Sequence, residues 1–390
     1  MKLLYYSPHP QLKIDAPTGY GTHMREMVAA WRRLGVEVRT LIAGDLGGES
    51  YGDNKGPRFA RLKPVVPPLF WESFKDFQLL RYDSGLEPQL RNAIKEFQPD
   101  ILYERVAYLQ NSGINAALKF GIKHVSEINA PYPEERMSFS GKSFFVKQAR
   151  DNERQILAKT DLVSTVSSAL KDHLASKMTD IENKILVVPN SVDPSEVVHT
   201  QADVDEIESL YKLKDKFVLG FVGSIFPYHG VDLLLEAFAE ISETENISLL
   251  VVGDGAILSE LKASARRTNV LERCIFTGSV PHRRVYPLME LMDISCMPKS
   301  NWYGSPVKIF EYGLMKKPVI APNVSPVRDV MTHNEDGILV EPNVQSLKEA
   351  ILKLIREKTF RAKISTSWHE KVLLKYTWDN AARRIIEACT

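Results

Sequence analysis

Hydrophobic residues fall into two kinds of segment, which alternate along the chain: short, nearly continuous apolar runs and longer stretches with apolar side chains at helical spacing. The first series begins with an apolar run at 2–7, a Pro- and Gly-rich loop ending at Gly21, and a helix-period segment from Met24 to Leu34. Further strands are predicted at 36–43, 100–103, 124–128, 162–166 and 185–188. Strands buried on both faces by helices give such runs, so the pattern predicts a doubly wound α/β domain.

A second series of the same kind follows a polar linker region at 199–215. Its strands are predicted at 217–223, 247–252, 274–277, 294–297 and 318–321, with helices that include 231–241, 283–292 and 306–315. The chain then ends in helices at 344–358, 360–376 and from Trp378 onward. The alternation predicts a second doubly wound domain.

Two segments of the first half are richer in aromatic or charged residues than a simple strand–helix series requires. Phe70, Trp71, Phe74 and Phe77 cluster at near-helical spacing and are interpreted as packed core, with an aromatic lid over a substrate as the less favoured alternative. One long charged helix is expected within 134–158, and its mixed signs favour a solvated face over a membrane-bound one. Substrate choice is expected in the loops 44–68 and 130–143, of which 59–62 could form a strand.

Composition adds few constraints. The chain has 390 residues, 44% of them hydrophobic, and a net charge of +1, which fits two soluble domains and gives no indication of nucleic-acid binding. Cys274, Cys296 and Cys389 are far apart and are expected to be reduced thiols, since no metal-binding spacing connects them. The apolar run at the start is too short for a signal peptide, and no segment approaches membrane-spanning length. A cytosolic protein, or one peripheral to a membrane, is expected.

The stretch 300–323, SNWYGSPVKIFEYGLMKKPVIAPN, carries the strongest chemical signal. Ser305 suits a helix N-cap and Pro306 suits the first helical position. The free backbone N–H groups at Val307 and Lys308, the helix dipole and the Lys308 ammonium together make a candidate anion site.

Glu311 lies one turn further along the same helix, beside the apolar stripe of Val307, Phe310 and Leu314. A carboxylate next to a buried face needs hydrogen-bond donors, and the two hydroxyls of a ribose would supply them. The alternatives are an i,i+3 pair with Lys308 or a solvated edge residue. An anion site and a diol acceptor one turn apart match the needs of a nucleoside diphosphate.

Weaker candidates lie at strand ends in the first half. Gly19 and Gly21 could let backbone approach a ligand after the first strand, or could form only a tight turn. Glu127 and Asn129 point to the same side of their strand and could hold a substrate hydroxyl, whereas a salt bridge and a turn-initiating Asn are the favoured alternative. Asp203 and Asp205 are interpreted as solvated charge in a helical linker and not as metal ligands.

Five motifs resemble the group-1 (family 4) glycosyltransferases: VVPNSVD at 187–193, FVGS at 221–224, HGVDLLLEAF at 229–238, VVGDG at 251–255 and GLMKKPVIA at 313–321. The resemblance implies the GT-B architecture, two Rossmann-like doubly wound domains facing a central cleft. Residues 1–193 would form the acceptor-side domain, with the final helix, about 376–390, packing back onto it, and residues 194–375 would bind the donor. The implied reaction is transfer of a hexosyl group from a nucleotide-diphosphate sugar to an alcohol with retention of configuration, without a metal or a further cofactor.

The resemblance also assigns residues. Lys308, Glu127, Asn129 and His229 become candidate catalytic residues, and the donor site would comprise Gly21, Ser224, His229, Gly253, Tyr303, Gly304, Ser305, Pro306, Val307, Lys308 and Glu311. This chain departs from the family pattern in having Ser224 for an Arg, His229 for a Lys, Tyr303 for the first of two carboxylates and Asn129 for a His. We expect a partly positive His229 to replace two cations, and hence weaker donor binding or stronger reliance on Lys308.

Two other functions fit the same architecture. A sugar-nucleotide epimerase would interconvert a nucleotide sugar with no acceptor present, whereas a transferase would at most hydrolyse it slowly. A catalytically weak binding subunit would bind nucleotide without turnover. Fold alone does not decide between these functions and sugar transfer.

Overall fold

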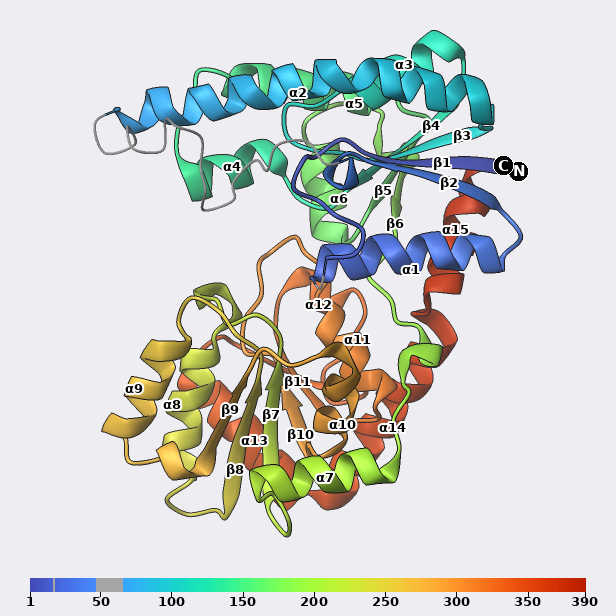
Figure 1. Cartoon of the computed structure of the whole chain (residues 1–390). Helices are drawn as coiled ribbons and strands as arrows, with labels where there is room; N and C mark the ends of the chain where they lie inside the picture. The colour runs from blue at the N-terminus through green and yellow to red at the C-terminus, as the bar shows by residue number, and fades with distance from the viewer. Residues whose placement is uncertain (17, 47–65) are drawn as a thin grey trace. The chain divides into compact units, whose positions relative to one another are not determined.

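The computed structural model describes residues 1–16, 18–46 and 66–390, and these residues form two compact units (Figure 1). Unit 1 comprises Met1–Pro189 together with Trp378–Thr390, and unit 2 comprises Asn190–Thr377. The possible strand at 59–62, and most of the loop at 44–68, lie outside the described residues.

Unit 1 contains a six-stranded sheet in the order β2-β1-β3-β4-β5-β6, with every neighbouring pair parallel. Its strands are β1 Lys2–Ser7, β2 Glu37–Ile42, β3 Ile101–Arg105, β4 Lys123–Ile128, β5 Leu162–Thr165 and β6 Ile185–Val187. Its helices are α1 Gly19–Arg33, α2 Pro68–Phe97, α3 Ser112–Phe120, α4 Tyr132–Ser140, α5 Val146–Lys159, α6 Ser168–Ala175 and α15 Trp378–Cys389.

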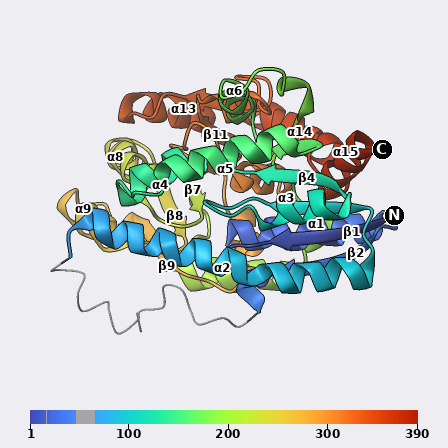
Figure 2. The ribbon, with the colours of Figure 1, turned by 90° about the horizontal axis from the view of Figure 1, so that it is seen from above.

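Helices cover both faces of this sheet, as Figures 1 and 2 show. On one face α1 and α15 pack Trp31 and Trp378 against Tyr5 and Tyr103 of the central strands. On the other face α2 and α3 bury an apolar stripe that includes Leu90 against the neighbouring strand positions. Burial from both sides explains why the strands are nearly continuous apolar runs.

Unit 2 repeats the arrangement with a six-stranded sheet in the order β12-β11-β10-β7-β8-β9. Its strands are β7 Phe217–Val222, β8 Ile247–Val252, β9 Cys274–Gly278, β10 Ile294–Cys296, β11 Val319–Pro322 and β12 Ile338–Val340. Its helices are α7 Gln201–Tyr211, α8 Val231–Ile241, α9 Leu258–Arg267, α10 Val285–Glu290, α11 Val307–Leu314, α12 Ser325–Arg328, α13 Val344–Arg356 and α14 Lys358–Lys375. All neighbouring strands are parallel, so the prediction of two doubly wound domains is confirmed.

The charged helix predicted within 134–158 is confirmed as α5, and a second helix, α4, precedes it. The chain forms two helices there, α4 and α5, because Gly141 adopts a φ of +82° directly after α4 and ends it. A positive φ is open to glycine without the steric penalty of a Cβ atom. Most of the loop expected at 130–143 is therefore helical.

The polar linker predicted at 199–215 contains the helix α7, whose start explains one of its acidic residues. Thr200 and Asp203 form a capping box, in which the Thr200 hydroxyl accepts from the Asp203 N–H and the Asp203 carboxylate accepts from the Thr200 N–H. Asp203 and Asp205 are both exposed, as expected for solvated charge.

The aromatic cluster of α2 is less buried than predicted. Phe70, Phe74 and Phe77 are 57%, 39% and 46% exposed, and Trp71 is half-buried. The helical spacing was real, but it places these rings on the face of α2 that points away from the sheet. The interpretation of this segment as packed core is therefore wrong.

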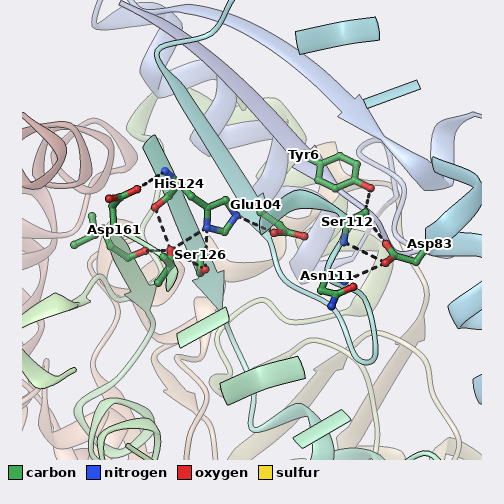
Figure 3. A network of polar contacts seen from close by, with 10 residues as sticks. Tyr6, Asp83, Glu104, Asn111, Ser112, His124, Ser126 and Asp161 are labelled. Atoms are coloured by element: carbon green, nitrogen blue, oxygen red, sulfur yellow. Dashed lines mark hydrogen bonds and ion pairs between the residues drawn. The ribbon is translucent and has the colours of Figure 1, made fainter. Parts of the chain in front are cut away.

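A buried polar network crosses unit 1 beneath α3 (Figure 3). The Asp83 carboxylate accepts hydrogen bonds from the backbone N–H groups of Asn111 and Ser112, both 3.1 Å, and so caps α3 from the neighbouring helix α2. Nearby, His124 lies between Glu104, at 2.9 Å, and Thr160, also at 2.9 Å. These long-range partners satisfy polar groups that would otherwise be costly to bury.

We expect Gly113→Ala to destabilise unit 1, because a Cβ at Gly113 would lie 2.3 Å from the Glu104 carboxylate of this network. Gly85→Ala is the matched control, since Gly85 is also helical but has no atom within 4 Å of its Cβ position. That control should stabilise the protein by about 0.5–1 kcal/mol, as expected for Gly to Ala in a helix. Denaturant unfolding of both variants measures the difference, and an equal effect of the two changes would contradict it.

Candidate functional site

The candidate anion site begins at α11, which runs from Val307 to Leu314. Pro306 is the N-cap residue, so the assignment of Ser305 to that position is wrong by one residue. The Ser305 hydroxyl instead accepts a hydrogen bond from the backbone N–H of Asn190 at 3.0 Å, and the Asn190 amide donates to the Ser305 carbonyl at 2.6 Å. With no side chain capping α11, its first N–H groups stay available to a ligand.

The loop before α11 is held in a tight turn. The Gly304 N–H donates to the side-chain oxygen of Asn301 at 2.6 Å, and a Cβ at Gly304 would lie 2.7 Å from that same oxygen. Tyr303 packs its ring edge-on against the ring of Trp302, with centroids 5.2 Å apart. The hydrogen bond to Asn301 fixes the backbone that leads into α11, and a side chain at position 304 would displace the Asn301 amide.

Lys308 is the positive group of the site. Its ammonium lies over the Phe221 ring, 4.5 Å from the centroid, and beside Gly223 at the end of β7. The nitrogen is buried and has no hydrogen-bond partner among the described residues. Burial lowers the pKa of Lys308 to about 7, although the nearby Glu311 carboxylate acts in the opposite direction. An ammonium held in this way is poorly compensated until an anion reaches it.

Glu311 is the acidic group one turn further along α11. Burial raises its pKa to about 7, against the opposing effect of Lys308. The two side chains influence each other electrostatically, but no ion pair within 4.0 Å joins them in the described part of the chain. The Glu311 carboxylate also accepts no hydrogen bond from any described residue. The structure therefore does not contain the i,i+3 salt bridge that was the alternative explanation for this residue.

His229 faces the same region from the loop after β7. Its Nδ1–H donates to the Ser224 carbonyl at 2.5 Å, which leaves Nε2 as an acceptor. Burial and the positive charge of Lys308 lower the pKa of His229 to about 4, so the ring is neutral at neutral pH. The expectation of a partly positive His229 is therefore wrong for the ligand-free protein. Burial disfavours the charged ring, and the nearby Lys308 ammonium repels a second positive charge.

Glycines bring the ends of β7 and β8 into direct contact. Gly253 has a φ of +133°, and a Cβ on it would lie 2.1 Å from the Gly223 carbonyl oxygen. The Gly223 N–H in turn donates to the Val252 carbonyl at 2.9 Å. Gly253 is therefore needed for this close approach, which shapes the backbone next to Lys308.

Glu127 has the structural role that was its alternative interpretation. It is 1% exposed and forms an ion pair with Arg105, and it also accepts hydrogen bonds from the Asn129 amide at 2.5 Å and the Tyr5 hydroxyl at 3.3 Å. Although burial alone would raise it, the pKa of Glu127 is held well below its usual range, chiefly by Arg105. A carboxylate so strongly paired is a poor proton acceptor. Asn129 keeps a buried side-chain oxygen without a hydrogen-bond partner, so its predicted role in holding a hydroxyl stays a prediction.

The prediction that Gly21 belongs to the loop before the first helix is wrong, because Gly21 lies in the first turn of α1. Its N–H donates to the Thr18 hydroxyl at 3.4 Å, and a Cβ there would lie 2.1 Å from the Ala16 carbonyl oxygen. Glycine is thus required for the chain to enter α1, whatever else it contacts. Its assignment to a donor site stays a prediction.

Asn190 is the residue that sequence reasoning missed. It lies within VVPNSVD, one of the motifs that carry the family resemblance, but the resemblance assigns no role to Asn190. Its two hydrogen bonds to Ser305 span 115 positions of the chain, so no local pattern indicates them.

Within the described ranges, no cluster of His, Cys, Asp and Glu side chains could hold a metal ion. No helix in the part of the chain described by the structure is long and apolar enough to cross a membrane. The candidate site comprises α11, the loops before it and after β7, and the side chains of Lys308, Glu311 and His229.

Comparison with protein-family models finds one match in each half of the chain. Residues 17–196 match the model described as Glycosyltransferase Family 4, and residues 204–370 match Glycosyl transferases group 1. The second match contains every residue of the α11 site except Asn190.

The proteins with similar sequences include two glycosyltransferases. An uncharacterized glycosyltransferase of Methanocaldococcus jannaschii is 25% identical over 57% of this chain and 58% of its own length. The 2-deoxystreptamine glucosyltransferase of Streptomyces kanamyceticus is 27% identical over 49% of this chain and 50% of its own length. These matches span little more than half of each relative.

Solved structures match over nearly the whole chain. Anabaena HepE in complex with UDP is 17% identical with a TM-score of 0.72, covering 99% of both chains. Sucrose-phosphate synthase from Thermosynechococcus elongatus is 15% identical with a TM-score of 0.73, covering 99% of this chain and 97% of that one. At these identities the similarity establishes the fold, and the GT-B prediction of two Rossmann-like domains is confirmed.

Proposed function

We propose that this chain, whose two halves each match a glycosyltransferase family model, transfers a hexosyl group from a nucleoside-diphosphate sugar to an alcohol with retention of configuration. One observation carries the proposal. Lys308 and Glu311 lie one turn apart on α11, the Lys308 nitrogen is buried and Glu311 is half-buried, and neither side chain has a hydrogen-bond partner among the described residues. A nucleoside diphosphate supplies what both lack.

The diphosphate is placed at the start of α11. There the uncapped N–H groups of the helix and the Lys308 ammonium both favour negative charge. Binding an anion restores the proton affinity of Lys308, because the phosphate oxygens replace the water lost on burial. As the bond to the sugar breaks, negative charge grows on the leaving phosphate, and the preorganised donors stabilise it.

The ribose is placed against Glu311. Its two hydroxyls donate to a carboxylate that receives no hydrogen bond from the described part of the protein. These charge-assisted bonds lower the pKa of Glu311 back toward its ordinary range and favour the ionised form. The opposite shifts of Lys308 and Glu311 are then relieved together by one ligand.

His229 does not take over the role of the lysine that the family pattern has at this position. With Nδ1–H committed to the Ser224 carbonyl, its Nε2 accepts a hydrogen bond from a sugar hydroxyl and adds no charge to the diphosphate. This leaves Lys308 as the only lysine or arginine assigned to the phosphates.

The reaction proceeds by front-face substitution. The acceptor oxygen forms its bond to the anomeric carbon on the face from which the phosphate departs, and the departing phosphate oxygen takes the acceptor proton. Such a step depends on positioning and on charge stabilisation more than on a strong protein base. Glu127, ionised and paired with Arg105, is not needed as that base.

A thermal-shift titration with UDP, GDP, dTDP and ADP tests the proposal. We expect one base to raise the Tm with a concentration dependence that gives its Kd. UDP is the first choice, because HepE binds it in a similar fold. The nucleotide sugar of that base, incubated with and without candidate alcohols, should give a retained glycoside only when an alcohol is present.

Three results would contradict sugar transfer. If none of the nucleotides raised the Tm, the proposed donor site itself would be contradicted. Interconversion of the nucleotide sugar without an alcohol would indicate an epimerase. Tight nucleotide binding with no product from a broad set of alcohols would indicate a binding subunit.

A further inference from the structure

Four phenylalanines form an exposed aromatic patch on unit 1. Phe70, Phe74 and Phe77 recur along the first half of α2 and are 57%, 39% and 46% exposed, and Phe144, between α4 and α5, is 61% exposed. Figures 1 and 2 show this half of α2 extending beyond the strands of its sheet, with α4 beside it. Exposed phenylalanines concentrated in one place are unusual on a protein surface that only meets water.

The patch is a built surface, because its elements are fastened to one another. The rings of Phe70 and Phe144 meet edge-on with centroids 5.5 Å apart. The Phe144 N–H donates to the Ser73 hydroxyl of α2 at 2.9 Å, which fixes the backbone that presents the ring. The rings of Trp71 and Phe74 also meet, with centroids 6.5 Å apart.

The acidic residues of this region are turned inward. Glu72 and Asp76 are 8% and 0% exposed, and the guanidinium of Arg136 on α4 bonds to Glu72 at 2.8 Å and to Asp76 at 3.0 Å. One arginine thus neutralises part of the acidic charge and ties α4 to α2 beneath the aromatic rings. Removal of these carboxylates from the surface leaves the surrounding exposed charge mainly basic.

The fully exposed charged residues next to the patch in the chain are positive, whereas Glu134 and Glu135 of α4 are half-buried and Glu134 pairs with Lys177. Arg81 follows Phe77 by one turn on α2, and Lys142, Lys147 and Arg150 flank Phe144 in the chain. The first exposed acid after Phe144 is Asp151, which pairs with Lys147, and the first on α2 after Phe77 is Glu87. Aromatic rings rimmed by lysine and arginine match the interface of a bilayer that carries anionic headgroups.

We propose that the aromatic patch docks unit 1 on the surface of an anionic lipid bilayer. The phenylalanine rings enter the boundary between headgroups and acyl chains, while the basic rim stays among the headgroups. Each lysine or arginine near such a surface contributes about 1 kcal/mol, and the contribution falls with added salt. Neither Lys308 nor Glu311 takes part, so the proposal stands or falls separately from the transferase function.

Co-sedimentation of the full chain with vesicles tests the proposal. We expect the protein to pellet with phosphatidylcholine vesicles that contain phosphatidylglycerol, much less with phosphatidylcholine alone, and less at high salt. The double variant Phe70→Ser/Phe144→Ser should bind the anionic vesicles at least about tenfold more weakly, since a tenfold loss needs only about 1.4 kcal/mol from two rings. Lys142→Glu/Lys147→Glu should lose binding to a similar extent.

Leu118→Ser is the matched control, because Leu118 is 49% exposed on α3 of the same unit but is not part of the patch. It should bind vesicles as the wild type does, and all variants should keep the wild-type Tm. The proposal is overturned if the wild type does not pellet with anionic vesicles, or if the Phe70/Phe144 variant pellets equally well. It is also overturned if light scattering shows a dimer that the same variant abolishes, since the patch would then be an interface between copies.

Discussion

Lys308→Met is expected to lower kcat/KM for the nucleotide-sugar donor by about 10²–10³ and, at the same time, to raise the Tm of the ligand-free protein. The loss of activity follows from removing the cation that stabilises the departing phosphate, an effect of this size for a preorganised group. The gain in stability follows because the Lys308 nitrogen is buried without a hydrogen-bond partner in the described structure. Methionine fills a similar volume over the Phe221 ring and needs no partner.

The pH dependence of stability provides a second readout of the same change. The pKa of Lys308 is about 7 in the folded protein and close to its ordinary value when unfolded. Between these values the unfolded chain binds more protons, so this lysine makes the free energy of unfolding rise with pH above about 7. Glu311, with a raised pKa of about 7, acts oppositely below neutrality, because the folded state then holds the extra proton. Lys308→Met should flatten the alkaline part of the curve.

Lys316→Met is the control, since Lys316 is an exposed lysine just after α11. It removes the same charge and should change neither kcat/KM nor the pH profile appreciably. Denaturant unfolding from pH 6 to 10, together with steady-state kinetics, measures both effects. If Lys308→Met kept its activity, the assignment of Lys308 to the phosphates would be wrong. If the variant were less stable than the wild type, buried Lys308 would not be destabilising the ligand-free protein.

The sequence was informative where a single segment contains the whole signal. The run from Ser305 to Glu311 places a helix start, a lysine and a carboxylate one turn apart, and local spacing alone predicts that arrangement. The strands of both sheets were equally accessible, because burial on two faces leaves continuous apolar runs such as 247–252.

The sequence did not indicate contacts between residues that are distant in the chain. The Arg105–Glu127 ion pair turns a candidate substrate ligand into a structural group, and nothing near Glu127 in the sequence indicates its partner. The same holds for Asn190, whose hydrogen bonds to Ser305 cross 115 positions, and for Arg136, which reaches Glu72 on α2. The same limit applies to His229, because its pKa is lowered first by burial and then by the charge of Lys308, and neither can be read from the sequence around it.

Aromatic residues at helical spacing were misleading for a related reason. The spacing of Phe70, Phe74 and Phe77 shows that they share one face of α2, but periodicity does not say which face the sheet covers. Leu79, Leu86 and Leu90 cover the inner face, so the phenylalanines are left outside. The spacing predicted the helix, but only the packing of α2 shows which of its faces is turned away from the sheet.

Glu311→Ala is expected to weaken nucleotide binding by about 10- to 100-fold, which corresponds to the roughly 1.5–3 kcal/mol of hydrogen bonds to a charged group. Removing this carboxylate leaves no unsatisfied donor behind, because no described residue donates to it in the free protein. The fold and Tm should therefore be retained. Isothermal titration with UDP, or with whichever diphosphate the thermal-shift titration selects, measures the loss.

Deoxynucleotides show whether the lost energy belongs to the ribose. The wild type should bind the 2′- and 3′-deoxy forms of that diphosphate more weakly than the parent nucleotide, whereas Glu311→Ala should bind all three with similar affinity. In this double-mutant cycle the coupling energy between the carboxylate and a hydroxyl should exceed about 1 kcal/mol. Glu335→Ala, which removes an exposed glutamate of the same unit, should leave every affinity unchanged. If Glu311→Ala still discriminated between ribose and deoxyribose as the wild type does, the hydroxyls would have another partner, and the burial of Glu311 would need a different explanation.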